Sequence, residues 1–220
     1  MLPLENLFPY IEQLLKQKER IVVAIDGMSA AGKSSFAKIL AEQVSCNLIH
    51  MDHFFLRPEQ RTPERLIAAG GNIDYERFIT EVALPLASGE PFSYKPFDCK
   101  TQDFDEPISI ELKPLTIIEG VYSMHPEIMK YSAQRRDCCS DAEASGLVPM
   151  RAHLSNSSYA EACLYDITIF MQIDEATQKH RLKERNPELY DRFVNEWIPM
   201  ESKYFEEFDI REKCTYVKKL

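Results

Sequence analysis

The chain has 220 residues, 45% of them hydrophobic, and a formal net charge of −9. This length and apolar content predict one globular domain over residues 1–220. A broad grip on DNA or RNA depends on clustered lysine and arginine, so the acidic balance argues against nucleic acid as a partner. The longest apolar run near the N-terminus, residues 21–25, is too short to span a membrane, and no basic segment precedes an apolar one in residues 1–10. We therefore expect a cytoplasmic protein with no membrane partner.

The six cysteines form no CxxC pair and have no regular spacing, which favours reduced thiols over a disulfide framework. A zinc site would have to draw on Cys138, Cys139, His153 and Cys163. Adjacent cysteines, however, lack the spacer that chelating pairs usually have. Unpaired thiols are the simpler interpretation.

In chain order, the first predicted element is a packing helix over residues 4–18, where apolar side chains recur at helical spacing. The sequence IVVAI, residues 21–25, follows as a β-branched run typical of a buried parallel strand. Helical spacing resumes after Gly32 and continues to Val44. Three further apolar strands are predicted, at residues 47–51, 115–118 and 167–173.

The alternation of strands and helices predicts an α/β fold with a mostly parallel sheet and helices on both faces. Ligands of such sheets bind beyond the carboxyl ends of the strands, where Asp26, Asp52 and Glu119 fall. Two segments depart from the alternation. Residues 56–73 are rich in proline, glycine and arginine and are expected to form a loop over the site, whereas residues 132–164 are expected to be an inserted surface segment.

Residues 27–34, GMSAAGKS, match the phosphate-binding pattern G-x-x-x-x-G-K-[ST] between a predicted strand and a predicted helix. The glycines let the backbone approach phosphates, the loop N–H groups attract anions, Lys33 reaches the β- and γ-phosphates, and Ser34 supplies a hydroxyl to magnesium. The motif makes the fold class a P-loop NTPase three-layer sandwich, with ATP and Mg²⁺ as expected cofactors. The predicted nucleotide-binding residues are Gly27, Met28, Ser29, Ala30, Ala31, Gly32, Lys33, Ser34 and Ser35.

Two strand-end carboxylates complete a candidate catalytic set. Glu119 stands where a P-loop protein needs a second group to hold magnesium, although a carboxylate that merely ends a strand would look the same. Asp52, in HMDHFF, is placed to accept the proton of an attacking hydroxyl, with a purely structural aspartate as the alternative. Of the histidines, His53 and His125 lie beside the predicted site, and both are interpreted as structural.

Arg181 and Arg185 are four residues apart in QKHRLKERN and therefore share one face of a predicted helix. That face is suited to close over the transferring phosphoryl group. A solvated helix whose basic residues are balanced by Glu184 is the competing interpretation. The apolar residues of the helical stretch 187–208 indicate a core or an interface, which permits a homo-oligomer without requiring one.

The segments GMSAAGKSS, MDHFF, NIDYERF, FSYKPFDCKT, IIEGVYSMHPE and HRLKERN together resemble the uridine kinase branch of the phosphoribulokinase and uridine kinase family. The similarity covers about residues 20–131 and 164–213. The P-loop is shared by many families, whereas MDHFF and the ordered segments after it are more specific. The resemblance implies that Asp52 is the catalytic base and that Arg181 and Arg185 are lid arginines, with Lys33 as the catalytic lysine of the P-loop.

The same resemblance implies an acceptor site that contains a ribose-binding carboxylate and an aromatic substrate contact. The predicted substrate-binding residues are Asp52, Phe54, Asp74, Arg77 and Phe97, among which the resemblance implies Asp74 as the carboxylate and Phe97 as the aromatic contact. Two positions depart from the family pattern. Phe97 stands in place of a tyrosine, with no base-reading histidine after it, and Asn186 replaces the aspartate that follows the second lid arginine.

The expected function is therefore ATP- and Mg²⁺-dependent phosphorylation of a hydroxyl on a small molecule, most simply uridine, cytidine or a similar nucleoside. Pantothenate, nicotinamide riboside or a sugar phosphate is the alternative acceptor. Four basic residues near the predicted site would suit an acceptor that is already anionic: Arg61, Arg65, Arg77 and Lys95. A P-loop regulatory ATPase or switch is the second class of function, although the sequence contains neither an NKxD nor an LSGGQ motif.

Overall fold

A five-stranded parallel sheet, in the order β2-β7-β1-β8-β9, forms the centre of the computed structural model, which describes residues 7–129 and 164–220. The strands are β1 Ile21–Gly27, β2 Cys46–His50, β7 Leu115–Glu119, β8 Ile167–Gln172 and β9 Tyr216–Lys219. Four of them coincide with the predicted apolar runs, with ends displaced by one or two residues. The edge strand β9 pairs in parallel with β8 and was not predicted.

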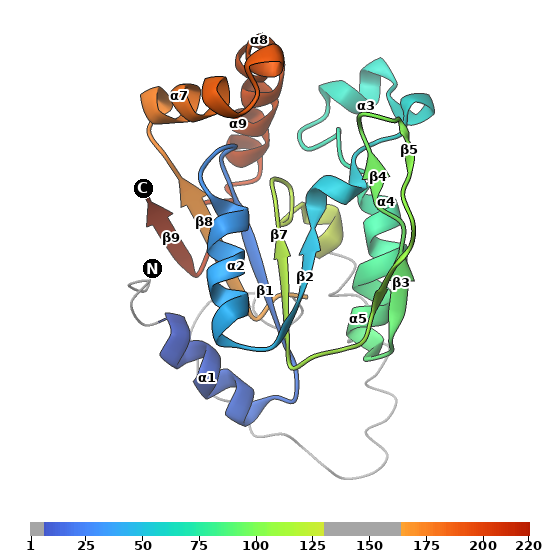
Figure 1. Cartoon of the computed structure of the whole chain (residues 1–220), viewed down its shortest axis with the longest axis vertical. Helices are drawn as coiled ribbons and strands as arrows, with labels where there is room; N and C mark the ends of the chain where they lie inside the picture. Colours follow the sequence, from blue (N-terminus) through green and yellow to red (C-terminus); the bar gives the residue numbers. More distant parts are fainter. Residues whose placement is uncertain (1–6, 130–163) are drawn as a thin grey trace.

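Helices cover both faces of the sheet, as Figure 1 shows. One face carries α1, Leu7–Gln17, and α2, Lys33–Gln43, and the other carries a continuous helix that ends at Ser88 together with α9, Ile198–Glu207. The continuous helix consists of α4 Tyr75–Phe78, η4 Ile79–Ala83 and α5 Leu84–Ser88. The predicted three-layer sandwich with a parallel central sheet is therefore confirmed.

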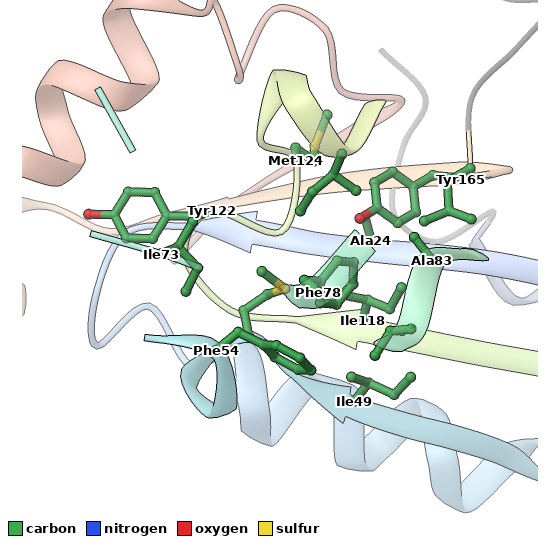
Figure 2. Close-up of a cluster of buried hydrophobic side chains, with 14 of the residues drawn as sticks. Ala24, Ile49, Phe54, Ile73, Phe78, Ala83, Ile118, Tyr122, Met124 and Tyr165 are labelled. Atoms are coloured by element: carbon green, nitrogen blue, oxygen red, sulfur yellow. The ribbon is translucent and has the colours of Figure 1, made fainter. Parts of the chain in front are cut away.

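Two apolar cores lie between these layers because side chains along a strand alternate between its faces. From β1, Val23 packs toward α1 and α2, whereas Ala24 belongs to the core on the opposite face. Figure 2 shows the second core, in which Phe54 lies close to Phe78 between the sheet and its covering helix. The Phe54 and Phe78 ring centroids are 5.1 Å apart, edge to face.

The carboxyl ends of the strands are flanked by two groups of elements, at the top of Figure 1. One group is α7 Glu175–Arg185, η6 Pro187–Leu189, α8 Tyr190–Arg192, η7 Phe193–Trp197 and α9. The other comprises η2 Met51–Phe54, η3 Pro58–Gln60, α3 Pro63–Ile67 and the antiparallel pair of β4 Phe97–Asp98 with β5 Asp103–Phe104. A second antiparallel pair, β3 Phe92–Tyr94 with β6 Ile108–Ile110, flanks the first pair in the chain. The segment 56–73, predicted as a loop, thus contains two short helices.

Part of the predicted organisation lies outside the described residues. The inserted segment 132–164 falls there except for Leu164, as do Cys138, Cys139, His153 and Cys163, so the one-domain arrangement stays a prediction. Among the described helices, none combines the length and the apolar character needed to cross a membrane. Residues 7–129 and 164–220 also contain no cluster of three or more histidine, cysteine or acidic side chains arranged to hold a metal.

Candidate active site

The glycine-rich loop follows β1 directly, and its backbone turns through two left-handed residues before α2 begins at Lys33. Ala30 has φ of 61° and Gly32 has φ of 79°. Successive turns of this kind form a concavity of backbone N–H groups that attracts anions. Gly27 is fixed by packing, because a β-carbon there would lie 2.0 Å from the carbonyl oxygen of Met171.

The Lys33 side chain is buried and folds back along the loop, where its Nζ donates to the carbonyl oxygens of Gly27 at 2.8 Å and Met28 at 3.0 Å. Beside it lies a cleft of about 140 Å³. The cleft is lined by Ser29, Ala30, Gly32, Lys33, Ser34, Ser35, Asp52, Glu119, Gly120, Val121 and Arg185. The structure therefore brings the P-loop, both candidate carboxylates and one lid arginine to the same cleft.

Ser34 and Glu119 meet inside this cleft, since the Ser34 hydroxyl donates to Glu119 Oε1 over 2.9 Å. His50, at the end of β2, places its Nδ1 2.5 Å from the same carboxylate oxygen. Although burial acts to raise the pKa of Glu119, its bonds to His50 and Ser34 hold that pKa below the usual range. The bond to Glu119 is also the main reason that the pKa of His50 is raised. Glu119 is thus kept ionised in the cleft.

These oxygens suit magnesium, which prefers hard oxygen ligands and commonly keeps several waters beside one or two protein groups. A hydroxyl and an ionised carboxylate, 2.9 Å apart at the start of α2, supply such a pair. Because magnesium also binds substrate phosphates, a cage of three or more acidic side chains is not needed here. The residues of the cleft therefore fit a magnesium nucleotide, with Ser34 and Glu119 as the groups that would hold the ion.

Asp52 stands in η2, two residues beyond the end of β2, and its carboxylate is exposed to the cleft. The surrounding protein nevertheless removes much of its hydration, and this desolvation raises its pKa above the usual value. The positive charge of Lys33 opposes the rise and the negative charge of Glu119 adds to it. A carboxylate of this kind is a better proton acceptor than an ordinary surface aspartate.

The two predicted lid arginines reach the P-loop from α7. Arg181 donates from Nη1 to the carbonyl oxygen of Ala30 over 3.1 Å. Arg185 lines the cleft, where its positive charge, like that of Lys33, opposes the rise in the pKa of Asp52. Lys179 is half-exposed and pairs with Glu175 on the same helix, and the side chain that best fits the solvated interpretation is the exposed Lys183. This helix thus carries both kinds of basic residue, and the arginines are the ones that contact the loop and the cleft.

The acceptor-side carboxylate Asp74 is engaged within the protein. It is 2% exposed, accepts from the backbone N–H of Arg77 at 3.0 Å and thereby caps α4, and also accepts from Gln60 Nε2 at 2.9 Å. Arg77 is likewise held by neighbours, since it donates to the carbonyl oxygens of His53 at 2.5 Å and Lys95 at 2.7 Å. Contact of Asp74 with a ligand would require Gln60 to move.

The two predicted aromatic contacts are both buried, but only one of them lines a cavity. Phe54 is fully buried, and in Figure 2 its ring points into the core, so the structure does not bring it to the surface of the cleft. Phe97 is 3% exposed and lines a second cavity of about 240 Å³. This cavity is lined by Arg57, Pro58, Glu59, Phe97, Gln102, Asp103 and Phe104.

Two of the other basic side chains near the predicted acceptor site bind groups in and beside the segment 56–73, which was predicted as a loop over the site. Arg65 donates to Glu76 and to the carbonyl oxygens of Gly71 and Ile73. Arg61 donates from Nε and Nη2 to the Leu56 carbonyl oxygen. The first therefore has a structural role in this loop, whereas the charge of Arg61 is met only by a carbonyl dipole among the described residues.

The two histidines that the sequence placed beside the site, His53 and His125, both have a lowered pKa. Burial lowers the pKa of His53 to about 4, and its Nδ1 lies 3.2 Å from the Tyr94 hydroxyl. Burial also lowers the pKa of His125 to about 4, and its ring stacks on that of Tyr75 with centroids 4.5 Å apart. Both are thus packed as structural side chains.

Sequence reasoning missed three residues that contact the site. His50 supports Glu119, and Gln178 and Glu201 bind the backbone of Ser29 from α7 and α9. The position of His50 at a strand end next to the aspartate motif was a usable signal. No local signal marks Gln178 or Glu201, because their partner lies 149 or 172 residues away in the chain.

No family model and no curated protein matches the sequence. Solved structures do match. A possible uridine kinase from Bacillus stearothermophilus is 17% identical, with 96% of this chain and 98% of that chain covered and a TM-score of 0.59. A fructose transport system kinase from Silicibacter, described as putative, is 18% identical over 96% and 97% with a TM-score of 0.58. D-glycerate 3-kinase from Cryptococcus neoformans is 14% identical over 98% and 95% with a TM-score of 0.56.

These likenesses and the cleft define the class of fold: the chain has the fold of the P-loop kinases. Within that class, its fold is similar to that of a possible uridine kinase, so the family resemblance drawn from the sequence is confirmed at the level of the fold. The three structures share one fold, yet their names point to different substrates: a nucleoside, a sugar and glycerate. Fold alone therefore does not select the acceptor.

Proposed function

We propose that the chain is a kinase that transfers the γ-phosphoryl group of ATP to a hydroxyl of a small molecule. The observation that carries the proposal is the meeting of the P-loop, the Ser34–Glu119 pair, Asp52 and Arg185 in one cleft. Phosphoryl transfer is catalysed mainly by positioning and by electrostatic stabilisation, and these groups provide both.

Each group has one role in this proposal. The N–H groups of the P-loop and Lys33 bind the donor phosphates, and Ser34 with Glu119 holds magnesium, which neutralises charge on the phosphates when bound. Asp52 orients the acceptor hydroxyl and takes its proton. Arg185, with Arg181 behind it on α7, places positive charge where the transferred group carries negative charge.

For the acceptor, the proposal names uridine, cytidine or a similar nucleoside first. Its support is the sequence resemblance together with the position of Phe97 in the wall of the second cavity. Asp74 is proposed as the carboxylate that binds ribose hydroxyls once Gln60 releases it. Pantothenate, nicotinamide riboside and sugar phosphates are the alternatives, and Arg61 is the basic residue that would favour an anionic acceptor.

The test is ADP release with MgATP against a panel of uridine, cytidine, other nucleosides, pantothenate, glycerate and sugar phosphates. We expect one acceptor class to raise turnover and Asp52→Asn to abolish the increase. Asp191→Asn, an exposed aspartate of α8, is the matched control and should behave as wild type. If no acceptor raises turnover and Asp52→Asn leaves it unchanged, the kinase proposal is wrong and the chain is a slow ATPase or switch.

A further inference from the structure

The P-loop residue Ser29 is held by a buried carboxylate from α9. Glu201 accepts a hydrogen bond from the Ser29 backbone N–H over 2.9 Å and a second, short one from the Ser29 hydroxyl. Glu201 is only 5% exposed. The contact joins residues 172 positions apart in the chain and connects α9 to the loop that lines the cleft.

The other side of the same residue is held from α7. Gln178, which is 1% exposed, donates from Nε2 to the Ser29 carbonyl oxygen over 3.0 Å. The next carbonyl along, that of Ala30, receives Arg181. The amide, hydroxyl and carbonyl groups of Ser29 are therefore all bound by side chains of α7 and α9, immediately before the left-handed turn at Ala30.

Glu201 is an unusual choice for a purely structural contact. Removing a carboxylate from water is costly unless a cation compensates, and burial accordingly raises the pKa of Glu201. Within residues 7–129 and 164–220 it forms no ion pair, and both of its hydrogen bonds come from Ser29. The cation whose charge acts most on it is Lys33, the phosphate-binding lysine of the same loop.

The helix α9 also contacts the acceptor side. Lys203 donates from Nζ to the Ile67 carbonyl oxygen over 2.6 Å, in the segment 56–73 that was predicted to lie over the site. Tyr204, one turn along from Glu201, donates its hydroxyl to Asp26 at the end of β1 over 2.8 Å. One helix thus binds the P-loop, the strand that carries it and the covering segment, so a displacement of α9 would alter all three.

We propose that Glu201 is a positioning residue for the phosphate donor: by binding the amide and hydroxyl of Ser29, it sets the conformation in which the following N–H groups of the P-loop face the phosphates. The inference rests on the proposed function in that the loop is taken to bind donor phosphates. It goes beyond that function by assigning a role to a residue of α9 that lines neither cavity. A preset loop loses less conformational freedom when the donor binds.

The experiment measures the dissociation constant of MgADP by calorimetry for Glu201→Ala, Ser29→Ala and the double variant. We expect Glu201→Ala to weaken binding by about tenfold, which is about 1.4 kcal/mol. Ser29→Ala should weaken it less, because the backbone N–H of residue 29 still donates to Glu201. The double variant should be no weaker than Glu201→Ala, because that substitution already removes the bond that the Ser29 hydroxyl makes. Glu207→Ala, an exposed glutamate of the same helix, is the control and should bind as wild type.

A second substitution separates hydrogen bonding from charge. Glu201→Gln keeps the shape and an acceptor oxygen, and the Ser29 hydroxyl can rotate to accept from the new amide. Positioning by hydrogen bonds therefore predicts that Glu201→Gln stays within about threefold of wild type. This variant also keeps the inference testable if Glu201→Ala does not fold, which melting curves without nucleotide would reveal.

Three results would overturn the inference. They are unchanged or tighter MgADP binding in Glu201→Ala, single effects that simply add in the double variant, and a Glu201→Gln variant as weak as Glu201→Ala. Tighter binding would mean that the carboxylate repels the phosphates. A wild-type chain that does not bind MgADP at all would instead refute the proposed function and, with it, the premise of this inference.

Discussion

Asp52 combines two properties that oppose each other in a folded protein, access to a cleft and loss of hydration. The desolvation that raises its pKa makes it a stronger base and at the same time makes its charged form less stable. Catalytic groups commonly carry such a cost, whereas a carboxylate that only ends a strand has no need of it. The two consequences can be measured separately, as activity and as stability.

The first consequence is a shifted pH profile. Asp52 accepts a proton only when it is ionised, so activity should fall as pH decreases through its pKa. Because that pKa is raised from its usual 3.8, the acid limb of kcat/KM should lie at a higher pH than an ordinary aspartate would give. A profile that stays flat down to pH 4, with the protein still folded, would contradict the role of Asp52 as base.

The second consequence is a stabilising Asp52→Asn substitution. Asp52 has a higher pKa in the folded chain than in the unfolded chain, so its protonated form favours folding. This contribution to the free energy of unfolding is complete below the unfolded pKa and is lost as pH rises through the folded pKa. At pH 7 the ionised Asp52 therefore lowers stability. Thermal denaturation should give Asp52→Asn a higher Tm than wild type at pH 7, with a smaller difference near pH 4. An equal or lower Tm at pH 7 would show that the charged form is not destabilised.

Ser34 gives a third prediction at the scale of one residue. Its hydroxyl bonds Glu119, whereas that of the adjacent Ser35 does not, although both line the cleft. Ser34→Ala should raise the magnesium concentration needed for half-maximal activity by about tenfold or more, a loss typical of disturbed metal sites. Ser35→Ala is the matched control in a magnesium titration. Equal shifts in both variants would mean that the Ser34–Glu119 pair does not hold the ion.

At the scale of elements, substitutions in α7 show whether only the basic residues on one face of the helix contribute to activity. Arg185 lines the cleft, whereas Lys183 is exposed and lies 6.0 Å from the Tyr190 ring centroid. Arg185→Met should lower kcat about a hundredfold, as expected for loss of one group that stabilises transition-state charge. Lys183→Met should leave kcat nearly unchanged. Similar losses in both would favour the solvated-helix interpretation.

The helix α2 offers a matched test of packing. Leu40 is 1% exposed against the sheet, whereas its neighbour Ile39 is 50% exposed. Leu40→Ala should lower the free energy of unfolding by about 2–5 kcal/mol, and Ile39→Ala by less than about 1 kcal/mol. Urea denaturation of the two variants measures this difference. Equal losses would mean that α2 does not pack as described.

Some elements were predictable because their signal is local. The run IVVAI gave β1, and the spacing of Gly27, Gly32 and Lys33 gave the P-loop at the start of α2. The strand β9 was not predicted from the sequence because half of its four residues, Lys218 and Lys219, are charged. A short edge strand of this kind is defined by its pairing with β8 and not by an apolar run of its own.

At the scale of the whole molecule, the contacts that could not be predicted are long-range ones between side chains. Gln60 donates a hydrogen bond to Asp74, 14 residues away in the chain, and Glu201 accepts one from Ser29, 172 residues away. A polar side chain in a loop or on a helix gives no sign of which distant backbone group it will bind. The sequence therefore predicted closely which residues line the cleft, whereas the surroundings of the predicted acceptor residues, with Phe54 turned into the core, are known only from the structure.

The whole account depends on one claim, that this cleft transfers a phosphoryl group to an alcohol. Following the phosphorus atom by ³¹P nuclear magnetic resonance, in MgATP with the acceptor that most stimulates turnover, tests it most directly. We expect a phosphomonoester signal that grows in step with ADP and is absent with Asp52→Asn. Growth of inorganic phosphate alone, at a rate that does not depend on the acceptor, would contradict it and identify the chain as an ATPase.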